Sequence, residues 1–327
     1  MDAYASLGST GVQVSPLCFG AMSFGAEADE QISAAMYRRV RDAGINFFDT
    51  ANIYNKGLTE EIVGRWLPSR RDAIVLASKV HFPTGAGPND RGSSRRHILR
   101  EVDKSLKRLQ TDWLDILYLH HWDTETPIEE TLSALTTLVE NGKVHYCGVS
   151  NFAAWQTMKA IAAARAGRWA PIACIQPMYN LVKRQAEVEI LPMAASQHLA
   201  VCPYNPLAAG LLTGKYRRGE TGRLDENPMY KDRYADPVYA EVAARFVDHA
   251  LTQGQSPAAL AVAWVIAHPA VTSAIIGARS LEQLNDTLGC LDIALDPDRR
   301  AEISALSIEP PPATDRTEER QAAQGTP

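Results

Sequence analysis

Short apolar runs of strand length recur along the whole chain. Their residues are almost continuously hydrophobic, without the polar alternation of a strand that has one face in water. Parallel strands that are covered on both faces require this pattern. The runs lie at residues 14–19, 45–48, 74–78, 116–119, 145–149, 173–175, 199–203 and 273–276.

Amphipathic stretches with helical spacing separate these runs. They lie at residues 29–43, 59–67, 94–109, 128–141, 155–166, 185–197, 238–253, 257–268 and 281–288. Strands that alternate with helices form βαβ units and a parallel sheet, which is either doubly wound or closed into a barrel. The eight candidate strands fit closure. We therefore expect an α/β fold, a (β/α)₈ TIM barrel, with residues 7–14 forming a hairpin at its floor.

Two segments interrupt the alternation, at residues 83–93 and 208–237. Long loops on a regular scaffold are usually lids or substrate-binding elements. We expect residues 1–308 to form one domain, and the polar, Pro-rich residues 309–327 to form a disordered tail.

Composition and charge exclude several classes of protein. Hydrophobic residues make up 46% of the chain, which is enough for a large core. A net charge of -5 gives no basic surface for nucleic acid, and no apolar run reaches membrane-spanning length. We expect a cytoplasmic protein. The five cysteines have neither CxxC spacing nor a nearby histidine, so we interpret them as small buried hydrophobes and expect no metal site.

Glycine-rich nucleotide motifs fail on their spacing. The glycines of 85–92 are too far apart for GxGxxG, and GLLTGK at 210–215 is one residue short of a P-loop. Tyr179 and Lys183 match the YxxxK pair of short-chain dehydrogenases, but the glycine-rich N-terminal unit of that class is missing. None of these motifs carries a prediction.

Polar residues close three of the predicted strands. Asp49 ends GINFFDT, Lys79 ends AIVLASK and His120 ends LDILYLH, while Tyr54 follows in the loop after Asp49. The C-terminal ends of barrel strands share one face, where catalytic groups collect. Each residue alone has an ordinary structural interpretation, as a cap, a buried cation, rim packing or a core imidazole. Four cooperating groups on one face favour catalysis.

These four groups suit proton donation to a developing alkoxide. A tyrosine hydroxyl has an ordinary pKa near ~10 and is a weak acid at neutral pH. An ammonium from Lys79 would lower the pKa of Tyr54, and Asp49 would hold Lys79 in place. His120 could donate a hydrogen bond to the substrate oxygen, completing an oxyanion site.

The chain also resembles the aldo-keto reductase superfamily, from about Leu7 to Leu306. The matching stretches are FFDTANIYNKGLTEEIVGRWL, LASK and LDILYLHHWD. In relatives the catalytic histidine precedes an Asp by three positions, which selects His120 over His121. Some relatives keep the barrel and the nucleotide but serve as regulatory subunits of membrane channels.

The resemblance implies a dinucleotide that lies extended across the barrel mouth, without a Rossmann domain. It implies NADPH as the cofactor, since Arg279 at a helix start suits a 2′-phosphate. Met22, Asn205 and Thr287 depart from the residues that are common in relatives. The implied cofactor-binding residues are Gly20, Met22, Ser150, Asn151, Gln176, Tyr204, Leu207, Ala209, Gly210, Leu211, Gly277, Arg279, Gln283 and Thr287.

We expect Phe24, Phe82, His121 and Trp122 to line an apolar substrate pocket. The leading hypothesis is NADPH-dependent, reversible reduction of an aldehyde or ketone, with Tyr54 as the proton donor. One alternative is a nucleotide-sensing regulatory subunit with little turnover. An aldolase that uses Lys79 as a Schiff base has little support, because Asp49 would keep Lys79 protonated. A metal-dependent isomerase has little support, because no histidine or carboxylate cluster has clear metal spacing.

Overall fold

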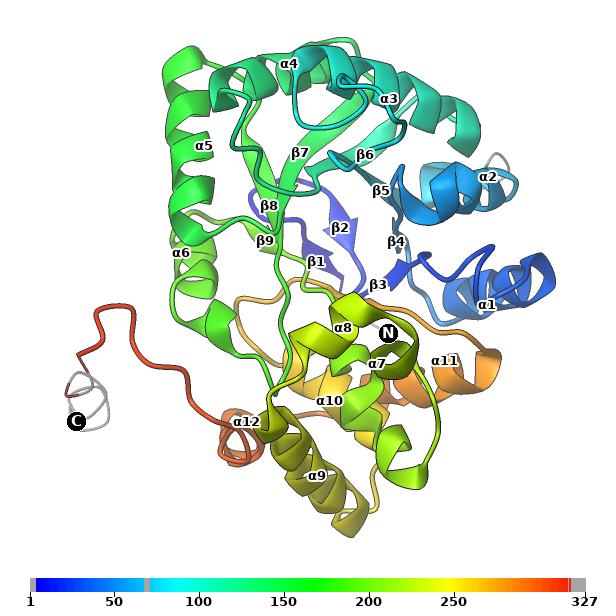
Figure 1. The fold of residues 1–327 in the computed structure, drawn as a ribbon, viewed down its shortest axis with the longest axis vertical. Helices are drawn as coiled ribbons and strands as arrows, with labels where there is room; N and C mark the ends of the chain where they lie inside the picture. The colour runs from blue at the N-terminus through cyan, green and yellow to red at the C-terminus, as the bar shows by residue number, and fades with distance from the viewer. Residues whose placement is uncertain (1–3, 68–70, 317, 319–327) are drawn as a thin grey trace.

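A computed structural model describes residues 4–67, 71–316 and 318. Eight parallel strands form one curled sheet in the order β10-β3-β4-β5-β6-β7-β8-β9, with helices around its outside (Figure 1). The strands are β3 (Leu17–Gly20), β4 (Phe47–Asp49), β5 (Val75–Val80), β6 (Leu114–Leu119), β7 (Val144–Ser150), β8 (Ile172–Gln176), β9 (Ala200–Val201) and β10 (Ala274–Ile276). Every strand that the apolar runs predict is present.

Backbone hydrogen bonds join the two outer strands of this sheet. The amide of Thr272 donates to the carbonyl of Val201 at 2.8 Å, and the amide of Ile275 donates to the carbonyl of Pro203 at 2.8 Å. These bonds connect β10 to β9 and close the sheet into a cylinder, so each of the two outer strands has a partner on both sides. The predicted (β/α)₈ barrel is confirmed.

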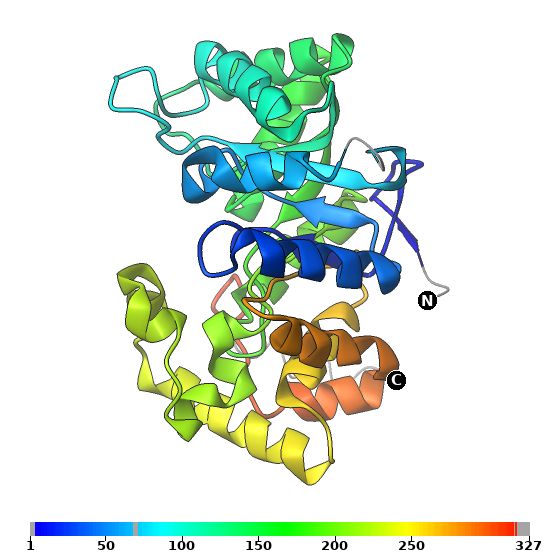
Figure 2. The ribbon, with the colours of Figure 1, turned by 90° about the vertical axis from the view of Figure 1, so that its right-hand side faces the viewer.

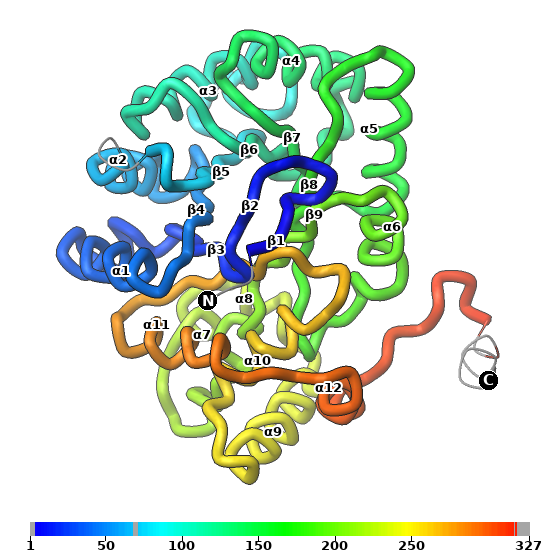
Figure 3. The backbone as a smooth tube through the Cα atoms, turned by 180° about the vertical axis from the view of Figure 1, so that it is seen from behind, coloured from blue at the N-terminus to red at the C-terminus, as the bar shows by residue number. Residues whose placement is uncertain are grey.

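A short antiparallel hairpin covers one end of the cylinder. Its strands are β1 (Ala5–Ser6) and β2 (Gln13–Val14). Leu7 and Val14 are fully buried and join the cluster of side chains inside the barrel. Figure 3 shows the hairpin lying across the rear of the strands, as the sequence predicts for the barrel floor.

Most of the outer helices match the predicted ones. They are α1 (Glu30–Asp42), α2 (Leu58–Gly64), α3 (Arg95–Leu109), α4 (Ile128–Glu140), α5 (Ala154–Gly167), α6 (Ile190–Ser196), α9 (Pro237–Thr252), α10 (Pro257–Ile266) and α11 (Leu281–Leu288). The helix that we expected at 185–197 is divided into η3 (Gln185–Glu187) and α6. Side chains of Asp29, Ser94, Ser256 and Ser280 cap helix N-termini by accepting backbone amides.

Several short helices were not predicted. The 208–237 segment contains η4 (Ala208–Thr213), η5 (Lys215–Arg218), α7 (Arg223–Glu226) and α8 (Pro228–Arg233), and α12 (Pro297–Ser304) follows η6 (Gly289–Asp292). The remaining 3₁₀ turns are η1 (Tyr54–Gly57) and η2 (Arg71–Ala73). We call residues 208–237 the mouth segment. Figure 2 shows it at the opposite end of the barrel from the hairpin.

The segment that follows α12 is described only in part. Residues 309–316 form no helix or strand, and the rest of the predicted tail lies outside the described residues, apart from residue 318.

All five cysteines are buried and free, which agrees with their interpretation as small hydrophobes. Within the part of the chain that the structure describes, no helix is both long and apolar enough to cross a membrane.

Candidate active site

One large cavity opens at the C-terminal ends of the strands, with a volume of about 1190 Å³. This exceeds the roughly 300–1,000 Å³ of common ligand pockets, so a dinucleotide and a substrate can share it. The predicted residues that line it are Gly20, Met22, Asp49, Tyr54, Phe82, His120, His121, Ser150, Asn151, Gln176, Tyr204, Leu207, Ala209, Gly210, Gly277, Arg279, Gln283 and Thr287. Lys79 is buried behind the lining of the cavity. Phe24, Trp122 and Leu211 do not line the cavity.

Lys79 is the centre of the proposed catalytic group. Its side chain is almost fully buried at the end of β5 and forms an ion pair with Asp49 at the end of β4. The Lys79 ammonium also donates to the carbonyl of Thr50 at 2.9 Å and to the hydroxyl of Tyr54 at 3.4 Å. The amide of Gln176 donates to the other Asp49 oxygen at 2.8 Å. Residues from strands far apart in sequence therefore meet at one point.

The protonation of Lys79 follows from these contacts. Burial lowers the pKa of Lys79 as the largest single influence, but Asp49 and Tyr54 together raise it above the ordinary lysine value. Lys79 is consequently a buried ammonium at neutral pH. Such a group is a poor nucleophile, which argues against Schiff-base chemistry here.

The pKa of Tyr54 differs from our expectation. Burial raises the pKa of Tyr54 above its ordinary value, and the opposing effect of Lys79 is smaller. We expected a lowered pKa because the sequence shows the neighbouring cation but not the depth of burial. Tyr54 is therefore a protonated hydroxyl at neutral pH, with an ammonium beside it that favours the phenolate once a proton leaves.

His120 completes the group on the cavity side. Its ring lies edge-on to the ring of Tyr54, with centroids 5.9 Å apart. Burial, and then the positive charge of Lys79, hold the pKa of His120 well below its ordinary value. Its Nδ1 atom is buried and has no hydrogen-bond partner among the described residues. His120 is a neutral imidazole that can donate one hydrogen bond to a substrate oxygen.

The predicted substrate walls divide into two pairs. Phe82 and His121 line the cavity, and Phe82 packs against His120 with ring centroids 4.8 Å apart. Phe24 is fully buried in the hydrophobic core, because the loop after β3 turns it inward against Phe19 and Trp66.

Trp122 is also displaced from the expected position. It packs against Phe152 and Trp155, with ring centroids 5.2 and 5.6 Å apart, beside the cavity instead of in its wall. The loop after β6 directs its side chain toward α5, a direction that residue spacing alone does not reveal.

One end of the cavity carries amide and hydroxyl groups. The hydroxyl of Tyr204 donates to Asn151 Oδ1 at 2.7 Å, and Asn151 Nδ2 donates to the carbonyl of His120 at 2.9 Å. Ser150 and Gln176 end the adjacent strands β7 and β8. These contacts place polar groups of the kind that recognise a carboxamide beside the catalytic group.

The start of the mouth segment has an unusual backbone. Ala208, Ala209 and Gly210 all have left-handed φ values, of 50°, 58° and 93°. Left-handed alanines cost roughly 1–2 kcal/mol each, so the surrounding contacts must hold them in place. Asn205 Oδ1 accepts a hydrogen bond from the backbone amide of Ala209 at 2.7 Å. Asn205, which differs from the residue that is common in relatives, therefore helps to hold this turn. Leu211 follows this turn but does not line the cavity.

The other end of the cavity is rich in cations. Arg279 forms ion pairs with Glu27 at 3.0 Å and with Glu226 of α7 at 2.9 Å. The backbone amide of Arg279 donates to Gln283 Oε1 at 3.1 Å, at the start of α11. Four further cations of the mouth segment, which sequence reasoning missed, also line the cavity: Lys215, Arg218, Arg223 and Arg233. The only sequence signal for the first three is the high density of basic residues between positions 215 and 223.

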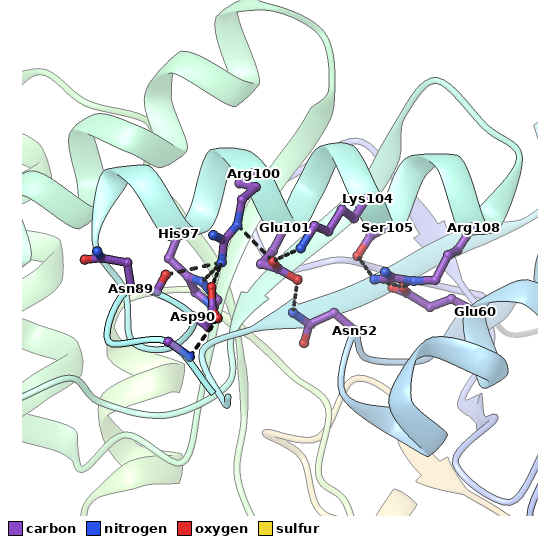
Figure 4. Close-up of polar contacts among 11 residues, drawn as sticks. Asn52, Glu60, Asn89, Asp90, His97, Arg100, Glu101, Lys104, Ser105 and Arg108 are labelled. Carbon is purple, nitrogen blue, oxygen red and sulfur yellow. Dashed lines mark hydrogen bonds and ion pairs between the residues drawn. The ribbon is translucent and has the colours of Figure 1, made fainter. Parts of the chain in front are cut away.

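A buried carboxylate lies behind the catalytic strands (Figure 4). Glu60 of α2 is fully buried, accepts a hydrogen bond from Ser78 Oγ at 2.5 Å and pairs with Arg108 of α3 at 2.7 Å. Ser78 directly precedes Lys79, and η1, which begins at Tyr54, leads into α2. Glu60 thus connects the segment that carries Tyr54 to the strand that carries Lys79.

Further along α3, Glu101 makes a similar connection. Its side chain is almost fully buried and pairs with Lys104 at 2.9 Å, while Asn52 Nδ2 donates to it at 3.5 Å. The backbone amide of Asn52 in turn donates to the carbonyl of Lys79 at 3.2 Å. The inner face of α3 supports the loop between Asp49 and Tyr54 from behind.

The closed barrel and its buried polar centre define a class of enzyme, and comparison with known sequences gives the family. Residues 16–308 match the Aldo/keto reductase family, and the chain belongs to it. The family includes oxidoreductases that act on carbonyl compounds, generally with nicotinamide cofactors.

For three relatives, the match covers most of this chain and most of the relative. The chain is 42% identical to the "Uncharacterized oxidoreductase YrpG" of Bacillus subtilis, over 90% of this chain and 92% of the relative. It is 38% identical to the "Probable voltage-gated potassium channel subunit beta" of Oryza sativa subsp. japonica, over 89% and 91%. It is 34% identical to "Norsolorinic acid reductase A" of Aspergillus parasiticus, over 90% and 78%.

The connection through Glu60 predicts a large loss of stability in Glu60→Ala. The substitution removes one partner of a buried pair, and we expect roughly 3 kcal/mol of lost unfolding free energy, near the lower limit for such changes, because Arg108 is partly exposed. Denaturant unfolding of the variant and the wild type measures this difference in unfolding free energy. Glu61→Ala, on the exposed face of the same helix, is the matched control and should change stability by less than about 0.5 kcal/mol. Equal losses in the two variants would contradict the prediction.

Proposed function

We propose that this protein reduces an aldehyde or ketone to the corresponding alcohol, reversibly, with NADPH as the hydride donor and Tyr54 as the proton donor. The observation that carries the proposal is the position of the Tyr54 hydroxyl. It lies 3.4 Å from the buried Lys79 ammonium, in the wall of the cavity. The ring of Tyr54 lies edge-on to the ring of His120. A protonated acid, a cation that stabilises its conjugate base and a neutral hydrogen-bond donor are thus assembled at one point.

The chemistry divides between the cofactor and the chain. When bound, the nicotinamide supplies the hydride that adds to the carbonyl carbon. His120 donates a hydrogen bond to the carbonyl oxygen, which polarises the C=O bond. Tyr54 gives its proton to the same oxygen as negative charge develops there. Lys79 stabilises the resulting phenolate, and Asp49 keeps Lys79 charged and in position.

The residues along the cavity fit a dinucleotide. Ser150, Asn151 and Gln176 would hold the nicotinamide carboxamide, and Tyr204 would stack on its ring. Backbone groups of Leu207, Ala209 and Gly210 would approach the pyrophosphate. The fit rests on two observations: one cavity includes both the amide groups and the cations, and the strained turn at Ala208–Gly210 contributes Ala209 and Gly210 to its lining. Strained backbone is frequent at ligand clamps.

Arg279 supports NADPH over NADH. Its guanidinium lines the cavity at the start of α11, where a helix N-terminus also favours negative charge. A guanidinium can bind a phosphate through two parallel hydrogen bonds.

A second candidate function follows from the 38% identity to a probable potassium channel β subunit. A regulatory subunit of that kind would bind nucleotide with little turnover. Purified protein incubated with NADPH and a broad carbonyl panel discriminates the two hypotheses by the absorbance of reduced nicotinamide. Turnover supports the reductase, whereas tight NADPH binding without consumption supports the regulatory role.

The first prediction from the proposed function concerns the proton donor. Tyr54→Phe removes the hydroxyl and keeps the ring, so kcat for carbonyl reduction should fall by at least about 100-fold, the usual size of a general-acid contribution. Steady-state kinetics measure kcat, and a fluorescence titration of NADPH should give a Kd within about twofold of the wild type, because the ring packing survives. Unchanged turnover would refute the assignment of Tyr54.

The second prediction concerns pH. Burial holds the pKa of Tyr54 above its ordinary value, so the acid stays protonated through neutral pH and loses its proton only as the pH rises past that pKa. The single-turnover rate of reduction should be level near neutrality and fall only above about pH 10. A decline that begins between about pH 7 and 8 would identify a different donor.

The third prediction concerns cofactor choice. Arg279→Met keeps the aliphatic bulk but removes the phosphate partner, so NADPH should bind at least about tenfold more weakly, as expected for a lost charge-assisted hydrogen bond. NADH affinity, measured by the same titration, should change little. A parallel loss for both nucleotides would show that Arg279 supports the fold of the mouth segment and does not select the 2′-phosphate.

A further inference from the structure

The cations of the cavity fall into two groups. The first lies around Arg279 and includes Lys215, whose pKa is lowered by burial and then by the charge of Arg279, so the two are close. This group faces the end of the cavity where we place the cofactor phosphates. The second is Arg233, the last residue of α8, which packs on the ring of Tyr230, as Arg223 also does. No part of the proposed mechanism uses Arg233.

Arg233 is half-buried and lines the cavity. Its guanidinium lies 5.2 Å from the ring centroid of Tyr230, and one of its nitrogens lies 3.7 Å from the sulfur of Met229. No carboxylate of the described residues comes within 4.0 Å of it or of Arg223 beside the same ring, whereas Arg218 and Arg279 in the same cavity both have acidic partners. A partly desolvated cation without a counter-ion favours an anionic ligand.

Contacts of α8 place this guanidinium at the reacting end of the cavity. The hydroxyl of Tyr234, the next residue, accepts from Asn205 Nδ2 at 2.7 Å and from Asn180 Nδ2 at 3.0 Å. Asn205 directly follows Tyr204, which we place against the nicotinamide. The electrostatics agree: burial raises the pKa of Tyr204, and the positive charge of Arg233 is the largest influence that opposes this rise.

The other groups at this end leave the charge of Arg233 uncompensated. The charges of Asp49 and Lys79 cancel within their ion pair. Phe82, Met229 and Tyr230, which line the same cavity, offer apolar surface. A ligand that suits this end has an apolar body and one negative group directed at α8.

We propose that the carbonyl substrate carries a carboxylate, which Arg233 binds while the carbonyl group faces Tyr54 and His120. The planar guanidinium matches a carboxylate through two parallel hydrogen bonds, a geometry that lysine cannot reproduce. The inference rests on the proposed reductase function and names the class of its substrate: aldehydes or ketones that bear a carboxylate at the end away from the carbonyl.

The test compares two aldehydes that differ in charge, 4-formylbenzoate and its methyl ester. The wild type should show the higher kcat/KM for the carboxylate. Arg233→Met should lower kcat/KM for 4-formylbenzoate by about tenfold to a hundredfold, the range of a hydrogen bond to a charged group, and leave the ester within about twofold. Arg233→Lys should recover only part of the loss. Arg217→Met is the matched control, because Arg217 is exposed, pairs with Asp248 and lies outside the cavity.

Each other outcome has a distinct meaning. If neither aldehyde is reduced, and a wider carbonyl panel is also inert, the proposed reductase function fails. If the ester is reduced and the carboxylate has no advantage that depends on Arg233, the reductase stands and the carboxylate proposal is overturned. If Arg233→Met weakens NADPH binding in a fluorescence titration, Arg233 serves the cofactor, and the proposal is again overturned. Unchanged thermal unfolding of Arg233→Met and Arg233→Lys excludes a folding defect as the cause.

Discussion

The buried ion pair between Lys79 and Asp49 constrains the rest of the structure. An isolated ammonium at this depth would lose its proton, because burial disfavours the charged form. The pair persists because both partners have further hydrogen bonds, from Lys79 to the carbonyl of Thr50 and from Gln176 to Asp49. Gln176 ends β8, whereas Asp49 ends β4, so the pair is satisfied only when the sheet curls far enough to bring these ends together. The closed barrel is thus a condition for the charge at its mouth.

The same constraint sets the properties of Tyr54. Burial keeps its hydroxyl protonated, and the ammonium beside it reduces the cost of losing that proton. The relative position of the two groups depends on packing outside the barrel, because Glu60 and Ser78 connect their segments to each other and to α3. A carboxylate pair of this kind contributes little net stability compared with an apolar pair, but its loss leaves an unpaired charge. Its value here lies in fixing the geometry of Tyr54 and Lys79.

Much of the fold could be predicted from the sequence, because parallel strands covered on both faces leave a direct trace as apolar runs. The same holds for Asp49, Lys79 and His120, since residues at strand ends must share one face of a barrel. Side chains on loops are different. Phe24 and Trp122 follow strand ends as Phe82 does, yet loop paths turn one into the core and the other toward α5.

Other features depend on tertiary contacts that have no sequence period. The short helices α7 and α8 are too brief to show a pattern, and tertiary contacts such as the Arg279–Glu226 ion pair and the hydrogen bonds of Tyr234 help to hold them in place. The raised pKa of Tyr54 likewise depends on burial, which appears only when the barrel is assembled. The cations of the mouth segment were visible as basic residues, but which of them face the cavity follows from these short helices.

At the barrel mouth, the residues proposed for proton transfer differ from the charged residues that would select the substrate. Within the proposed catalytic group, Asp49 balances Lys79 and His120 is a neutral imidazole, so this group itself would exert little preference for charged or neutral carbonyl compounds. Preference must come from residues around it. The mouth segment supplies several of these residues, with Lys215 near Arg279 and Arg233 near Tyr204. Because this segment lies outside the closed sheet, substitutions within it can change which molecules are bound while the strands keep Tyr54 and Lys79 in register.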